Sequence, residues 1–202
     1  PSLGSSTPAL LTGVSGFMAQ MALEQAVSEI TDYLKEIDAK LDDLLRDQKD
    51  QTVSKLAGIS HMIDETMFIY QQVGSISATT WSKVSGCPQD IATLQAYAIA
   101  KIKSLTEKAE REQDPKQVRP LTQQIRQEIH QWLGMLASAV KMQDQVSCIE
   151  LARVCQEEPE QLEAYKKGIV LARNKRLEEI EQSLNALGKQ LEEKAKTVGG
   201  QV

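Results

Sequence analysis

The sequence contains few aromatic residues and few prolines. Two Phe, four Tyr, two Trp and six Pro occur among its 202 residues. Such a scarcity of aromatic side chains is untypical of strand-rich cores. The chain is instead rich in Ala, Leu, Ile, Gln, Glu and Lys, which lose little side-chain entropy in a helix. This composition predicts an all-α fold, and the scarcity of proline permits long uninterrupted helices.

Acidic residues outnumber basic ones, with 28 Asp and Glu against 23 Lys and Arg, and the chain has three cysteines. The net charge is −5 at pH 7, and the short basic cluster at 173–176 is followed by three Glu, so we expect it on a solvated helix face and expect no nucleic-acid partner. Cys87, Cys148 and Cys155 lack the spacing of a metal site. We expect small buried thiols in a reducing compartment, and therefore a cytoplasmic protein.

Catalytic motifs are missing too. His61 and His130 are the only histidines, and Glu65, one helical turn after His61, does not complete a metal site with it. The sequence contains no GxSxG motif, no P-loop and no glycine-rich turn after a strand. We therefore expect no enzymatic activity, no cofactor, no metal and no small-molecule substrate.

The most regular pattern in the sequence is a heptad repeat in its first quarter. Apolar residues recur at alternating intervals of four and three, the spacing typical of a helix that packs against another helix. This first seam consists of Leu23, Val27, Ile30, Leu34, Ile37, Leu41 and Leu44. The polar residues 46–52 interrupt it, and there the helix either turns back or continues to about residue 73.

A second heptad repeat lies near the C-terminus. This second seam consists of Leu177, Ile180, Leu184, Leu187 and Leu191. It belongs to the last of three helices expected at about 89–112, 120–156 and 159–196, after a connection over 74–88. Pro115 is expected in a turn before Pro120 starts a helix, and Pro159 either reverses the chain or kinks it. We predict one elongated antiparallel helical bundle or coiled coil over 1–202, with four or five long helices.

Residues 1–23 carry no charge, and the stretch 8–23 is apolar. Gly13, Gly16 and Ala19 recur every three residues, and small residues let helices approach closely in lipid. A glycine-containing apolar segment ahead of long amphipathic helices resembles the layout of α-helical pore-forming toxins, which implies an element that is sheltered in the soluble form and released at a membrane. The alternative is burial inside the bundle. The candidate membrane segment comprises Leu10, Leu11, Gly13, Val14, Gly16, Phe17, Met18 and Met21.

These patterns predict a protein that acts by binding other proteins. The two seams offer coiled-coil faces to a second copy or to another helical protein, unless both are satisfied within the chain. We expect a non-enzymatic helical scaffold or protein-interaction module. The alternative is a membrane-active or pore-forming protein that meets lipid through residues 8–23. Because the chain begins at Pro1 and ends in a glycine-containing tail, we expect a fragment or a processed product, and a secreted or membrane-associated location stays open.

Overall fold

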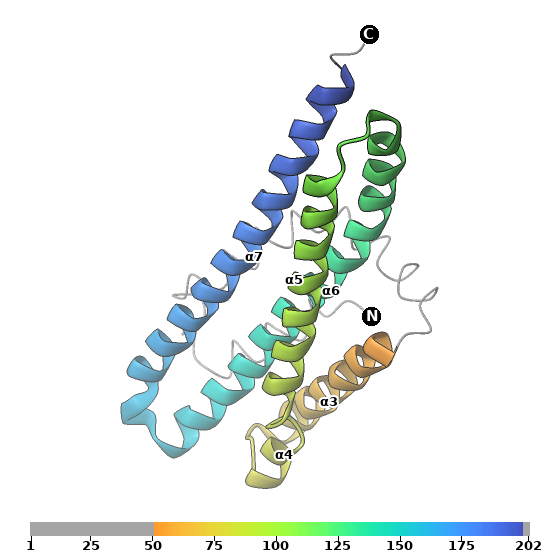
Figure 1. The fold of residues 1–202 in the computed structure, drawn as a ribbon. Coiled ribbons are helices and arrows are strands. Elements are labelled where there is room, and N and C mark those ends of the chain that lie inside the picture. The colour runs from red at the N-terminus through yellow and green to blue at the C-terminus, as the bar shows by residue number, and fades with distance from the viewer. Residues whose placement is uncertain (1–50, 200–202) are drawn as a thin grey trace.

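The computed structural model describes residues 51–199, and all regular structure in this part of the chain is helical (Figure 1). No strand occurs between residues 51 and 199, which confirms the all-α prediction for them. The first seam, the candidate membrane segment and the polar residues before 51 lie outside the described residues. The elements are α3 (Gln51–Val73), α4 (Ala78–Ser82), α5 (Cys87–Arg111), α6 (Pro115–Glu157), the 3₁₀ turn η3 (Pro159–Gln161) and α7 (Leu162–Gly199).

The long helix α6 begins earlier than the sequence analysis expected. Its first residue is Pro115, and the side chain of Asp114 caps it by accepting a hydrogen bond of 3.0 Å from the backbone N–H of Lys116. Proline is favoured at a first helical position because the N–H that it lacks would have no partner there. Pro120 lies inside α6 instead of starting it, close enough to the N-terminus to remove a single backbone hydrogen bond.

The segment 74–88, expected to be a plain connection, contains a short helix. Gly74 ends α3 with a φ of 77°, a left-handed conformation that favours glycine, and its N–H donates to the Tyr70 carbonyl at 2.7 Å. Ser77 then caps α4 by accepting a hydrogen bond of 3.1 Å from the backbone N–H of Thr80. Helix α5 starts at Cys87, two residues before the expected boundary.

At Pro159 the chain reverses direction, which decides between the two alternatives for this residue (Figure 1). Hydrogen bonds across the turn join Glu150 to Tyr165 and, farther from it, Asp144 to Arg173. The residue with the lower number on α6, Asp144, pairs with the residue with the higher number on α7, Arg173, so the two helices run antiparallel. Pro159 disfavours continuation of α6 because it offers no N–H and crowds the preceding turn.

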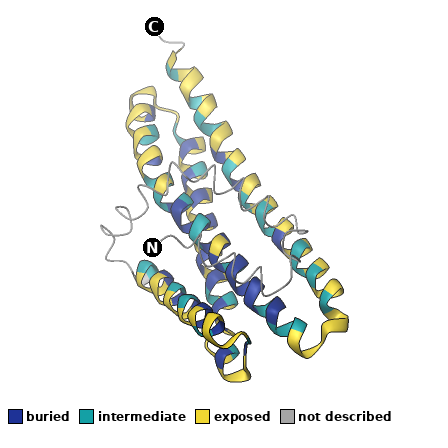
Figure 2. Cartoon of the chain, turned by 180° about the vertical axis from the view of Figure 1, so that it is seen from behind, coloured by how far each residue is buried: buried dark blue, intermediate teal, exposed yellow. Residues whose placement is uncertain are grey.

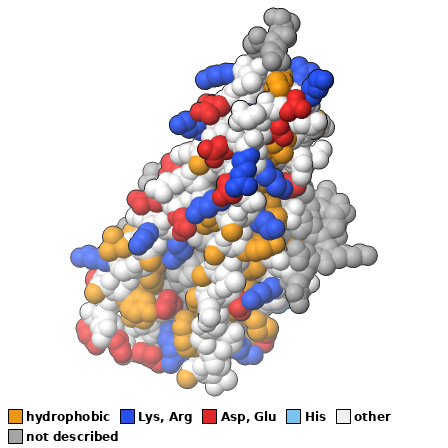
Figure 3. Space-filling view, in the orientation of Figure 1, with side chains coloured by type: hydrophobic (Ala, Val, Ile, Leu, Met, Phe, Trp, Pro, Cys, Tyr) orange, Lys and Arg blue, Asp and Glu red, His pale blue; other side chains and the backbone are white. Residues whose placement is uncertain are grey.

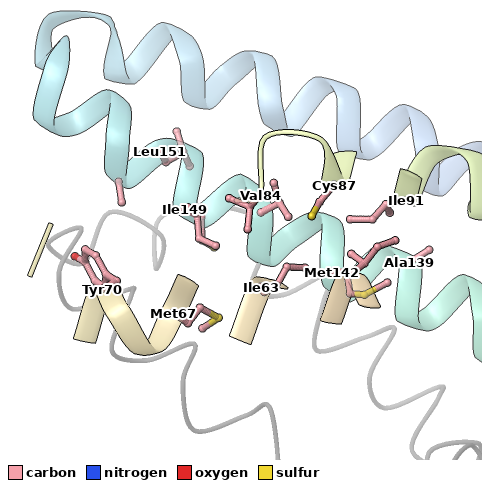
Figure 4. Close-up of a cluster of buried hydrophobic side chains, with 14 of the residues drawn as sticks. Ile63, Met67, Tyr70, Val84, Cys87, Ile91, Ala139, Met142, Ile149 and Leu151 are labelled. Carbon is pink, nitrogen blue, oxygen red and sulfur yellow. The ribbon is translucent and has the colours of Figure 1, made fainter. Parts of the chain in front are cut away.

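The described helices pack on one another through two groups of buried side chains. Helices α5, α6 and α7 each contact the other two, and α3 contacts α5 and α6. Apolar residues that recur at helical spacing along α5 are all buried: Ile91, Leu94, Ala98, Ile102 and Leu105. The first cluster joins α3, the start of α5 and the C-terminal half of α6, and includes Ile63, Met67, Val84, Ile91, Met142 and Ile149 (Figure 4).

The second cluster joins α5, the N-terminal half of α6 and α7, and includes Ile102, Ile125, Leu136 and Leu187. Burial is greatest along the middle of α6 and slight along α7 (Figure 2). Of the 38 residues of α7, those that are buried are Arg173, Ser183 and Leu187. Helix α7 is therefore held by few fully enclosed side chains, two of which are polar. Within residues 51–199 no helix has both the length and the apolar character that crossing a membrane requires.

Candidate functional site

A buried ion pair joins α6 to α7. The Arg173 Nε donates to Asp144 Oδ1 at 2.9 Å, and its Nη2 donates to Asp144 Oδ2 at 3.0 Å, so the guanidinium grips both oxygens of the carboxylate. The Arg173 side chain is 2% exposed. Its third nitrogen, Nη1, is buried and has no hydrogen-bond partner among the described residues. Burial raises the pKa of Asp144, while the bonds from Arg173 and the charge of Arg176 counteract part of that rise.

Next to the ion pair, α6 and α7 enclose a hollow of about 330 Å³ that opens to the surface. The lining residues from α6 are Gln143, Ser147 and Glu150, which lie about one turn apart on one face of that helix. The Tyr165 hydroxyl donates to Glu150 Oε1 at 2.5 Å at the end near the chain reversal. This hydrogen bond is the main reason that the pKa of Tyr165 rises to about 12. The lining consists of Gln143, Ser147 and Glu150 from α6 and Tyr165, Gly168, Ile169, Ala172 and Arg176 from α7.

Arg176 lies toward the other end of the hollow. It is half-buried, and within residues 51–199 it forms no ion pair. Burial lowers the pKa of its guanidinium, an effect that the nearby charge of Asp144 opposes. The group nevertheless stays charged at neutral pH because arginine starts from a very high pKa. One end of the hollow thus holds a partly desolvated cation.

The cysteines and histidines form no reactive centre in the described part of the chain. Burial raises the pKa of Cys148 to about 12 and also raises that of Cys87, so both thiols are poor nucleophiles at neutral pH. Cys155, expected to be buried, is half-exposed. His61 is exposed. Between residues 51 and 199 no cluster of His, Cys, Asp and Glu has the arrangement of a metal site.

The second seam faces the body of the protein. Leu187 is 3% exposed and belongs to the second cluster. Ile180, Leu184 and Leu191 pack against that cluster but remain partly exposed, as does Leu177. The seam is therefore used within the chain, although four of its five side chains keep contact with solvent. On the face of the molecule seen in Figure 3, acidic and basic side chains are interspersed.

The buried ion pair was not predicted from the sequence. The basic cluster at 173–176 was expected on a solvated face, whereas Arg173 is buried, Arg176 is half-buried, and residues 174 and 175 are exposed. The heptad period gave the missing signal: Arg173 precedes Leu177 by four residues and so continues the second seam toward the N-terminus. A charged residue at such a position requires a buried partner.

No protein-family model matches the chain, no curated protein is significantly similar to it in sequence, and no solved structure is significantly similar to it.

Proposed function

We propose that this protein is a non-enzymatic helical interaction module, with the second seam on α7 as its partner-binding face. The observation that carries the proposal is the partial exposure of Leu177, Ile180, Leu184 and Leu191. When a second helix removes partly exposed apolar side chains at heptad spacing from water, association is favoured by about 25 cal/mol per Å² of apolar surface that becomes buried. Because α7 buries few side chains, it can shift its position on the rest of the protein to accommodate a partner helix.

The proposal extends to the whole chain. We propose that residues 1–202 form one elongated antiparallel helical bundle with four or five long helices, in which the first seam provides another coiled-coil face. Support comes from the alternating directions of α5, α6 and α7 (Figure 1) and from the heptad spacing over 23–44. The partner that fits such faces is an amphipathic helix, either in a second copy of this chain or in another helical protein.

Light scattering coupled to size-exclusion chromatography tests this function. The wild-type chain is expected to show a mass above the monomer value of 22.4 kDa, in a concentration-dependent manner. Leu184→Lys places a charge on the seam and should return the chain to a monomer with unchanged helix content. Asn185→Lys adds the same charge at an exposed neighbouring position and should leave the assembly intact. A wild-type chain that is strictly monomeric and captures no partner from a lysate would contradict the proposal.

Contact with a membrane through residues 8–23 is the second candidate function. The observation in its favour is the absence of charge from residues 1–23. Dye release from liposomes is the direct measurement. Phe17→Asp should abolish leakage, because a carboxylate near the centre of an inserted helix costs about 2.5–3.5 kcal/mol. Phe17→Leu keeps the segment apolar and should preserve leakage. If the wild-type chain releases no dye across pH values and lipid compositions, this candidate is wrong.

A further inference from the structure

Hydrogen-bond donors without partners within residues 51–199 line the hollow between α6 and α7 from its Arg176 end to its middle. The Arg176 guanidinium, the Ser147 hydroxyl and the Gln143 amide all line it. Within residues 51–199 none of the three forms a hydrogen bond or an ion pair. The antiparallel register places Gln143 near Arg176, because Asp144, adjacent to Gln143, pairs with Arg173, less than one turn from Arg176. Ser147 lies one turn farther along α6, toward Glu150. Ser147 is 3% exposed, so its hydroxyl has little access to water on any other side.

The charges around the hollow do not cancel at this end. Asp144 is gripped by Arg173 through two hydrogen bonds, so these two charges offset each other. The remaining carboxylate, Glu150, lies about 10 Å farther along α6 than Gln143, at 1.5 Å per residue. It accepts the Tyr165 hydroxyl there. Arg173, Arg176 and Asp144 together leave one net positive charge at the Arg176 end. The buried Nη1 of Arg173, which has no hydrogen-bond partner within residues 51–199, lies on the adjoining turn of α7.

We propose that the Arg176 end of this hollow binds an oxyanion, either a carboxylate or a phosphate group. A guanidinium offers two parallel N–H donors that match two oxygens of such a group, and the Ser147 hydroxyl and Gln143 amide supply further donors. The half-buried Arg176 guanidinium has the Asp144 carboxylate nearby, but both oxygens of that carboxylate accept hydrogen bonds from Arg173. An anion that enters the hollow therefore replaces hydration that burial has removed from Arg176. Binding at this site does not depend on the second seam, and the inference goes beyond the proposed function.

The lining of the hollow also limits the size, polarity and charge of the rest of the ligand. Its volume of about 330 Å³ exceeds what a single carboxylate or phosphate fills. Beyond Arg176 the lining turns to Ala172, Ile169 and Gly168, and then to Glu150. The fitting ligand therefore has its oxyanion at one end, a small apolar middle, and no negative charge at the end near Glu150. A free small-molecule anion and the Asp or Glu side chain of a partner protein both meet this description.

NMR of arginine side chains in the full chain tests the site. With increasing inorganic phosphate, the Nε–Hε signal of Arg176 should shift and saturate, whereas chloride at equal ionic strength should produce at most a small linear drift. Arg176→Gln removes this signal and thereby identifies it. In the same variant, the phosphate affinity, measured from the signals of the remaining lining residues, should fall at least tenfold. Arg119→Gln removes an exposed arginine of the same helix pair and should leave the phosphate affinity unchanged.

A second titration separates the two sources of the oxyanion. An alanine-rich peptide with one central Glu, capped at both ends, should bind more tightly than acetate if a protein side chain is the natural occupant, and no better than acetate if the occupant is a free small anion. Ser147→Ala provides a milder variant in case Arg176→Gln unfolds the chain, with an affinity loss of about threefold or more. Shifts that stay linear for phosphate, acetate and peptide alike would overturn the proposal.

Discussion

Replacement of Arg173 by Met should lower the free energy of unfolding by about 3–5 kcal/mol at pH 7, the cost of leaving a buried charge without its partner. The substitution keeps an unbranched, flexible side chain of similar reach but removes both hydrogen bonds to Asp144. The carboxylate of Asp144 would then lie between α6 and α7 with no guanidinium to offset the loss of its hydration. Urea unfolding, monitored by circular dichroism, measures the change directly.

The decrease in the free energy of unfolding of the Arg173→Met variant should depend on pH. Burial already raises the pKa of Asp144 in the folded protein above that in the unfolded chain, and removal of Arg173 raises it further. Between the two pKa values the folded state holds a proton that the unfolded state has released, so the free energy of unfolding falls as pH rises. The variant should therefore be closest to wild type near pH 4 and lose stability on the way to pH 7.

A double substitution provides the matched control. Asp144→Leu combined with Arg173→Met replaces the whole pair by apolar side chains, and buried ion pairs exchanged in this way often cost nothing or even stabilise. The double variant should recover most of the stability that the single variant loses. The pH dependence that the Asp144 carboxyl causes should disappear. A single variant that loses less than about 1 kcal/mol would show that solvent or another group compensates Asp144.

The apolar faces of the helices were predictable because they depend on periodicity alone. A period near 3.6 placed Ile91, Leu94 and Ile102 on one side of a helix, and all three are buried. The reversal at Pro159 was one of two outcomes that the sequence allowed, since proline disfavours continuation but does not choose between a kink and a turn. Tertiary contacts, which no local pattern encodes, made that choice.

The residues that line the hollow could not be predicted from local sequence patterns, for a different reason. Gln143, Ser147 and Arg176 are common on solvated helix faces, and only the register between α6 and α7 brings them to one place. Pro120 illustrates the opposite error: its strong preference for a helix start was real, but Asp114 and Pro115 satisfy the same preference five residues earlier, with a cap. Where two start signals compete, the one with a side-chain cap prevails here.

Leu187→Ala should have the second large effect, because Leu187 is the one apolar side chain that α7 buries between residues 162 and 199. Truncation of a buried leucine to alanine removes its transfer free energy and leaves a cavity, together about 2–5 kcal/mol. Leu171→Ala, the same change on the same helix at a side chain that is 71% exposed, should alter the free energy of unfolding by no more than about 0.5 kcal/mol.

Hydrogen exchange of backbone amides would locate the effect of Leu187→Ala within the molecule. If α7 is held mainly by Leu187 near its C-terminal half and by Arg173 near its N-terminal half, amides of α7 on the C-terminal side of residue 177 should exchange faster in the variant. Those of α3 and the buried middle of α6 should change only as far as global stability does. Uniform acceleration in all the helices would instead mean that α7 separates only when the whole protein unfolds, and that α7 does not adjust to a partner on its own.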